Sequence, residues 1–234
     1  MPRLFAALIR HGDYAQLPDT PSAHQPFALS PQGQAQALRV ALAVADQRQR
    51  ERWQLAPEID SSEQLRAWQT ASIIANAQLE PPAVASFAAL AERGLGSAAN
   101  LTLAQIEQAV ADDPRCPPLP ADWKSNSHFR LPLPGAESLM QAGERVAQHL
   151  RLRMAELAAQ ASADTVKLFV GHGAAFRHAA HQLAVLSFPQ IARLSMYHAH
   201  PVLLEYWPTP NGQGRWCHVA GHWKVRKRGA GVLD

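Results

Sequence analysis

Two histidines follow apolar segments of the chain, and each histidine is followed by a glycine. The stretch AALIRHG places Arg10 and His11 before Gly12, and the stretch TVKLFVGHG places His172 before Gly173. A guanidinium matches phosphate oxygens in charge and geometry, and a helix N-terminus after Gly173 would add backbone donors. A neutral imidazole can attack phosphorus and accept a phosphoryl group. These residues therefore predict a phosphoryl site with a nucleophilic histidine.

The elements that must position these side chains alternate between strand and helix. Leu4–Ile9 and the segment TVKLFV are continuous apolar runs of strand length, typical of strands that are buried on both faces. PEIDSS predicts another strand, and the helix expected over residues 64–77 carries a further cation, Arg66. Ligands of α/β sheets bind at the carboxyl ends of the strands. We therefore expect the two histidines and the two arginines to meet at one edge of the sheet.

Caps and apolar spacing indicate the helices. Ser30 and Pro31 predict an N-cap and a first turn. The apolar positions of the helix that follows include Leu38, Leu42 and Ala45. In the helix over residues 64–77, turn spacing joins Leu65, Trp68 and Ala71 or Ser72. A long helix runs through Leu139, Gly143, Val146, Leu150 and Leu157. These faces are expected to pack against the sheet.

The pattern as a whole predicts a three-layer α/β/α fold with a mostly parallel central sheet, as one domain over residues 1–234. Two final strands are expected near Val202–Trp207 and Trp216–Val219, on either side of the turn TPNGQG. Residues 89–136 are rich in proline and contain one expected helix near Leu103–Val110. We interpret this stretch as a loop-rich cap over the active site.

Composition excludes several classes of protein. The chain is 47% apolar but has no run of about 18 apolar residues and no secretion signal, so we expect a cytoplasmic protein that does not enter a membrane. Cys116 and Cys217 lack the spacing of a metal or disulfide framework. The net charge is +3, partly from KVRKRG at residues 224–229. Without a basic stripe interleaved with aromatics, that segment indicates a solvated tail rather than a nucleic-acid interface.

Five motifs occur in order along the chain: LIRHGDYAQ, SSEQLRAWQTASII, LAERGLGS, PGAESL and VGHGAAFRHAAHQL. Together they resemble the successive motifs of the histidine phosphatase superfamily, the phosphoglycerate mutase-like proteins, over nearly the whole chain. The resemblance implies that His11 accepts the phosphoryl group. It implies that Arg10, Arg66 and His172 hold the phosphate oxygens. Glu92, in LAERGLG, matches the acid that protonates the leaving group and later activates water.

Several roles stay open on the sequence alone. Glu107, Asp112 and Asp13 are alternatives to Glu92 as the acid. Glu137 either stabilises the start of the long helix or lies near the phosphate. Two arginines, Arg66 and Arg177, could also be surface residues of their helices.

The remaining histidines come in three pairs: His178 and His181, His198 and His200, and His218 and His222. None of these pairs has the spacing of a zinc motif, so we expect no metal and no cofactor. His198 lies just before an expected strand, at a position where proteins of the resembled family carry small polar residues at the pocket edge. We therefore expect it to contact the substrate.

Departures from the mutase pattern favour the phosphatase branch. Asp13-Tyr14 and Leu17 stand where glycolytic mutases carry a Glu-Thr pair and an asparagine. We therefore predict a phosphomonoester hydrolase of the histidine acid phosphatase type with a phosphohistidine intermediate. The alternatives are mutase-type phosphoryl transfer and a non-catalytic module that binds phosphate or a phosphoprotein. The expected partner is a small phosphorylated substrate or a phosphoprotein, a homodimer is allowed, and no nucleic acid is expected.

Overall fold

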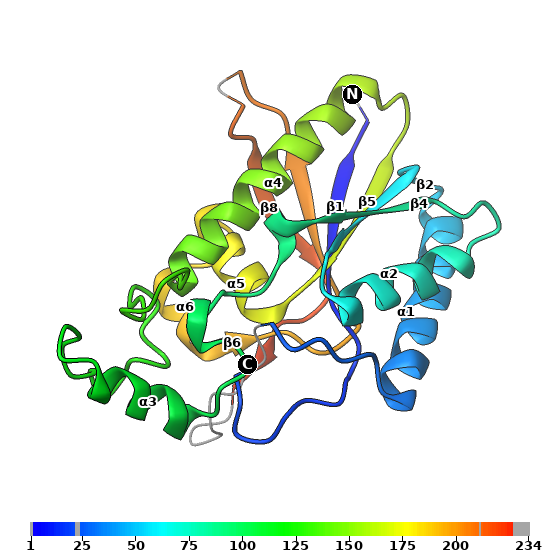
Figure 1. The fold of residues 1–234 in the computed structure, drawn as a ribbon. Helices are drawn as coiled ribbons and strands as arrows, with labels where there is room; N and C mark the ends of the chain where they lie inside the picture. Colours follow the sequence, from blue (N-terminus) through cyan, green and yellow to red (C-terminus); the bar gives the residue numbers. More distant parts are fainter. Residues whose placement is uncertain (1, 22–23, 211, 227–234) are drawn as a thin grey trace.

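A seven-stranded sheet forms the centre of the computed structural model, which describes residues 2–21, 24–210 and 212–226 (Figure 1). Its strands are β1 (Leu4–Arg10), β2 (Gln54–Leu55), β3 (Glu58–Ser62), β4 (Ala83–Phe87), β5 (Thr165–Gly171), β7 (Pro201–Trp207) and β8 (Arg215–Ala220). Their order is β4-β3-β5-β1-β7-β8, with β2 beside β5. The strands from β4 to β1 run parallel, whereas β7 is antiparallel to both β1 and β8.

Helices cover both faces of this sheet. The α-helices of the described residues are α1 (Pro31–Glu51), α2 (Leu65–Asn76), α3 (Leu103–Asp112), α4 (Leu139–Gln160), α5 (Gly173–Gln182) and α6 (Phe188–Arg193). Helices α4 and α5 pack on one face, and α1 and α2 pack on the other (Figure 1). The predicted α/β/α fold with a mostly parallel sheet is thereby confirmed. In the ranges that the structure describes, no helix has the length and apolar character needed to cross a membrane.

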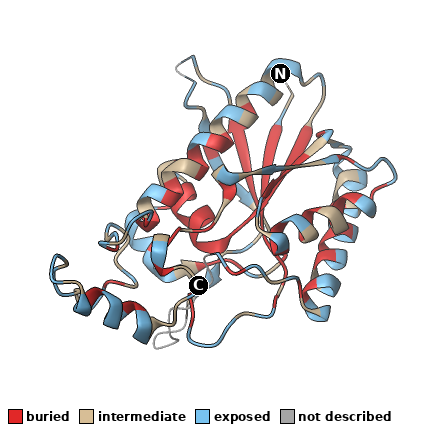
Figure 2. Ribbon diagram, viewed as in Figure 1, coloured by how far each residue is buried: buried red, intermediate tan, exposed pale blue. Residues whose placement is uncertain are grey.

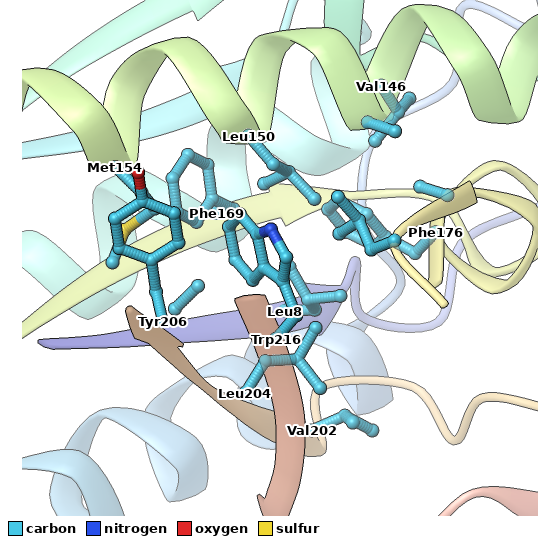
Figure 3. Packing of buried hydrophobic residues seen from close by; sticks show 14 of the residues in the cluster. Leu8, Val146, Leu150, Met154, Phe169, Phe176, Val202, Leu204, Tyr206 and Trp216 are labelled. Carbon is cyan, nitrogen blue, oxygen red and sulfur yellow. The ribbon is translucent and has the colours of Figure 1, made fainter. Parts of the chain in front are cut away.

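The side chains of β1 point alternately to the two faces of the sheet and so pack into both halves of the core. The buried residues of this core are red in Figure 2. Leu4, Ala6 and Leu8 pack toward α4 and α5, whereas Phe5, Ala7 and Ile9 pack toward α1 and α2. Figure 3 shows the first half, in which side chains of α4, α5 and four strands interlock. Because successive strand residues point to opposite faces, a strand with helices on both sides must be apolar throughout. This is the physical reason for the continuous run LFAALI.

The expected apolar faces of α1 and α2 are wrong at several positions. Leu38 is 49% exposed and Leu42 59% exposed. The buried side of α1 instead consists of Gly33, Ala37, Val40, Ala41 and Val44. Leu65 and Trp68 of α2 are also exposed, whereas Ala71 is buried as predicted. Small residues let a helix approach its neighbours closely, so here they form the packed side and the leucines face outward.

The remaining segments lie outside the three layers. Residues 89–136 contain the short helix η2 (Gly96–Ala98) and α3, and they overlap η1 (Ala88–Leu90). They enclose a small apolar cluster that includes Ile106 and Trp123. The two final strands occur as predicted; Asn211, in the turn between them, lies outside the described residues. Part of the expected tail is a strand, because β9 (Lys224–Val225) pairs with β6 (Leu194–Ser195). Residues 227–229 of that segment also lie outside the described residues.

Candidate active site

The carboxyl ends of β1 and β5 bring the two histidine-glycine pairs together. In the register of these strands Arg10 lies beside Gly171, and the His11 amide donates to the Gly171 carbonyl at 2.9 Å. The ring centroids of His11 and His172 are 5.1 Å apart. A Cβ atom at Gly12 would lie 2.5 Å from the Gly33 carbonyl oxygen, so glycine is needed where the start of α1 touches this loop.

His11 is buried, and its ring is held in one tautomer. Its Nδ1 lies 2.7 Å from the Gly12 carbonyl oxygen, which can only accept, so Nδ1 carries the proton. Nε2 therefore has a lone pair, and it accepts a hydrogen bond of 3.2 Å from Arg66 Nε. The Nε2 lone pair of the imidazole thus faces the Arg66 guanidinium.

Arg66 is fully buried at the start of α2, so the reading of Arg66 as a solvated surface residue is wrong. Its Nη1 donates to the Gln25 carbonyl at 2.9 Å, and its Nη2 donates to His172 Nδ1 at 3.3 Å. The guanidinium also lies over the Tyr14 ring, with Cζ 4.6 Å from the ring centroid. Arg66 therefore links β1, α2, β5 and the loop after β1.

His172 has the opposite tautomer to His11. Because arginine can only donate, Nδ1 of His172 accepts from Arg66, and its Nε2–H donates to Ser62 Oγ at 2.9 Å. Arg10, the second cation, is buried and donates from Nη1 to the Met196 carbonyl at 3.1 Å. Gly173 begins α5 directly against this side chain, since a Cβ there would lie 3.1 Å from Arg10 Cδ. All four nitrogen-rich side chains thus meet at one sheet edge, as expected.

Both imidazoles are neutral at neutral pH in this arrangement. Burial lowers the pKa of His11 well below its usual value, and the nearby His172, Arg66 and Arg10 lower it further. Burial and the same two arginines lower the pKa of His172 in the same direction. Since a protonated imidazole has no lone pair to attack with, these shifts favour a nucleophile.

Glu92 is buried beside the start of α5. Its Oε2 accepts from the Ala174 amide at 3.2 Å, two residues after His172, and its Oε1 accepts from the Arg93 amide at 2.8 Å. The carboxylate thus lies at a helix N-terminus, where negative charge is favoured.

The three alternative acids are bound elsewhere. Glu107, on α3, accepts from Trp123 Nε1 and forms an ion pair with Lys124. Asp112 accepts from Gln108 on the same helix. Asp13 lies in the loop after His11, where it accepts from Ser30 Oγ at 2.6 Å at the start of α1. Glu92 is the one of the four candidates whose carboxylate touches the segment that begins with His172.

Sequence reasoning missed the residue that holds the Glu92 loop. Arg145 of α4 donates from Nη1 to the carbonyls of Ala88, Ala89 and Ala91 at 3.2, 2.9 and 3.2 Å. Its Nη2 donates to Glu137 Oε1 at 2.7 Å, and the same oxygen accepts from the Gly94 amide at 3.1 Å. Glu137 precedes the helix cap and is therefore not an acid of the first turn of α4; it binds this loop instead. No local sequence pattern pointed to Arg145, because the carbonyls that it binds lie more than fifty residues before it.

The other expected positions are also located. Arg177 is buried and donates to the Leu194 carbonyl, so it is not a surface residue. His198 lies edge-on to His11 with ring centroids 5.3 Å apart, and burial lowers its pKa to about 4. His178 and His181 bind backbone carbonyls within their own region. Among the described residues, no three His, Cys, Asp or Glu side chains converge as metal ligands.

Comparison with known proteins gives the same picture. The sequence matches the model of the histidine phosphatase superfamily (branch 1) over residues 6–216. Mycobacterial glucosyl-3-phosphoglycerate phosphatase is similar in structure, with a TM-score of 0.65 and 22% identity over 96% of this chain and 97% of that one. Phosphoglycerate mutase from Bacillus anthracis has a TM-score of 0.68 and 16% identity over 94% of this chain and 92% of that one. No curated protein sequence matches significantly.

At these identities the solved structures show a common fold and nothing finer. The family model, however, runs from β1 into β8 and includes both strand-end histidines, Arg66 and Glu92. The chain belongs to the histidine phosphatase superfamily, branch 1.

Proposed function

We propose that this protein is a phosphomonoester hydrolase that works through a phosphohistidine on His11. The observation that carries the proposal is the orientation of the His11 ring. Its Nδ1–H is bound to the Gly12 carbonyl, and its unprotonated Nε2 faces Arg66. A buried, neutral imidazole with its lone pair aimed at guanidinium groups is suited to attack a phosphate that those groups hold.

In the first step the nonbridging phosphate oxygens bind Arg10, Arg66, His172 and the Gly173 amide. A phosphate dianion would favour uptake of a proton from solvent by His172, whose Nδ1–H could then donate to it; this proton returns to solvent when phosphate leaves. His11 Nε2 attacks phosphorus, and an N–P bond forms as the P–O bond to the alcohol breaks. Glu92 in its protonated form gives its proton to the departing oxygen.

In the second step water attacks the phosphohistidine. The Glu92 carboxylate takes a proton from that water as the new P–O bond forms. The N–P bond breaks and its electron pair returns to His11 Nε2. The net reaction converts the phosphate ester and water into the alcohol and phosphate. His11 and Glu92 regain their starting protonation states.

Residues 89–136 are proposed to cover this site and to set the choice of substrate, a small phosphorylated molecule or a phosphoprotein. Support comes from Glu92, which belongs to this stretch and contacts α5 beside His172. The named structural neighbours include one phosphatase and one mutase, so both chemistries occur on this fold. A cytoplasmic location and a homodimer stay predictions from the sequence.

The test is hydrolysis of p-nitrophenyl phosphate in the presence of EDTA, with acid-labile phosphate on His11 measured by rapid quench. His11→Asn should abolish both, whereas His222→Asn, an exposed position, should change neither. Isomerised product with little free phosphate would favour a mutase. Orthovanadate binding without any phosphohistidine would favour a binding module. Full activity of His11→Asn would overturn the proposal.

A further inference from the structure

A cavity of about 660 Å³ opens on the α1 side of the sheet. Its floor comes from the strands and includes Ala7, Leu168 and Leu203, and one wall comes from α1 through Val40 and Val44. The lining also includes the segment 197–201, which leads into β7. Cavities of roughly 300–1,000 Å³ with a mostly apolar lining are typical of sites for small organic ligands.

The charged side chains around this cavity are all basic. Arg39 and Arg48 of α1 and Lys224 of β9 line it, and the lining includes no aspartate or glutamate. Within the described part of the chain, none of the three forms an ion pair. Arg48 donates to the neutral amide oxygen of Gln78, and Lys224 lies over the Tyr197 ring. The cavity therefore combines an apolar lining with basic side chains that pair with no carboxylate among the described residues.

We propose that this cavity binds a small organic anion with an apolar body, such as a medium-chain carboxylate. The strand side chains would cover the hydrocarbon, and the anionic head would lie toward Arg39 and Lys224. Apolar area removed from water supplies most of the binding free energy, while the charges select an anion over a neutral molecule of the same shape.

This cavity is separate from the catalytic cluster. His11, Arg10, Arg66 and Glu92 do not line it. The shared side chain is His198, which lines the cavity and lies edge-on to His11. A ligand in the cavity and an oxyanion at His11 should therefore bind together rather than compete. The inference is independent of the proposed hydrolysis, and either can fail alone.

The experiment is a fluorescence titration with 8-anilinonaphthalene-1-sulfonate, an anionic aromatic probe. We expect saturable binding with one probe per chain that persists in saturating orthovanadate. Ala43→Trp, which places an indole in the cavity, and Arg39→Glu should each weaken binding by about tenfold or more. The controls are Leu42→Trp and Arg50→Glu, which introduce the same side chains on α1 outside the cavity. They should bind the probe like the unaltered protein.

Competition tests the class of ligand. Octanoate should displace the probe at concentrations at which 1-octanol does not. Equal displacement by both would contradict the role of charge. Equal weakening in the cavity and control variants, or loss of binding in orthovanadate, would place the probe elsewhere and overturn the proposal. Light scattering that shows a dimer abolished by Ala43→Trp would assign the cavity to a second copy of the chain and also overturn it.

Discussion

The residues around His11 keep its imidazole unprotonated. Burial and four nearby nitrogen-rich side chains lower its pKa, so the ring stays unprotonated while an ordinary histidine gains its proton near pH 6.5. As the pH falls through 6.5, His11 becomes protonated in the unfolded chain but stays neutral in the folded protein. Burial of this ring therefore lowers the free energy of unfolding at acid pH. The nucleophile itself remains available in mildly acidic solution.

We therefore expect the His11 ring signals to titrate below pH 6.5 in the unliganded protein. The measurement is nitrogen NMR of the imidazoles, with His11→Asn used to assign the signals. His198, whose pKa is about 4, should also stay neutral as the pH falls below 6.5. A His11 midpoint at or above 6.5 would mean that the ring is not held as described.

Glu92 gives a second prediction at the scale of one residue. Glu92→Gln keeps the shape but cannot donate the proton, so alkyl phosphates should be hydrolysed roughly 10²–10⁴-fold more slowly and activated aryl phosphates much less so. Steady-state rates of hydrolysis for a series of phosphate esters with different leaving groups measure the difference. Glu107→Gln, on α3, is the control and should leave the series unchanged. Equal slowing of both ester classes would remove Glu92 as the proton donor and turn attention to Asp13.

At the scale of elements, α4 holds the loop that carries Glu92. Arg145 binds three carbonyls just before Glu92, and Glu137 binds the amide of Gly94 just after it. Small displacements of a proton donor cost much in rate. Arg145→Met should therefore slow the hydrolysis of alkyl phosphates by about 10- to 100-fold, with a smaller change in KM.

A double-mutant cycle tests whether Arg145 acts through Glu92. In the Glu92→Gln background, Arg145→Met should add little further slowing, because the group that it positions is already inactive. Fully additive effects would show instead that Arg145 supports the fold in general. Arg151→Met, on the same helix with an ion pair to Glu144, serves as the control.

The sequence predicted strands better than helix faces. The run LFAALI had to be apolar because two helical layers cover β1, so the sheet and the meeting of His11 with His172 could be foreseen. The buried side of α1 could not, because it is made of glycine, alanine and valine while Leu38 and Leu42 face outward. Local patterns do not reveal long-range contacts such as that of Arg145 with the Glu92 loop, which spans more than fifty residues.

At the scale of the whole molecule, a buried charge cluster joins α4 to the sheet. Asp60 of β3 is fully buried and is contacted by Lys167, by His149 at 2.8 Å and by Arg153 Nε at 2.9 Å. Burial alone would raise the pKa of Asp60, but the hydrogen bond from His149 and the charge of Lys167 outweigh it and hold the pKa below its usual range. The stabilisation is therefore present at neutral pH and is lost as the pH falls through the acidic range.

Asp60→Asn should lower the free energy of unfolding by about 3–5 kcal/mol, because it removes the buried carboxylate that pairs with the buried Lys167. Urea denaturation at neutral pH measures the loss. Glu156→Gln removes a half-exposed carboxylate that pairs with Arg153, and it should cost less than about 1 kcal/mol. Similar losses in both variants would mean that the buried cluster adds no more than a surface ion pair.

The hydrogen bonds of Arg66 to Gln25, His11 and His172 join parts of the chain that are far apart in sequence. The unfolded chain cannot reproduce this grouping, so an oxyanion that binds there shifts the folding equilibrium toward the native state. At a hundred times its dissociation constant, orthovanadate should add about 2.7 kcal/mol to the free energy of unfolding. Thermal denaturation should show the gain in the unaltered protein and in Glu92→Gln but not in Arg66→Ala. The melting temperature is then a binding assay that can screen phosphorylated compounds before any substrate is known.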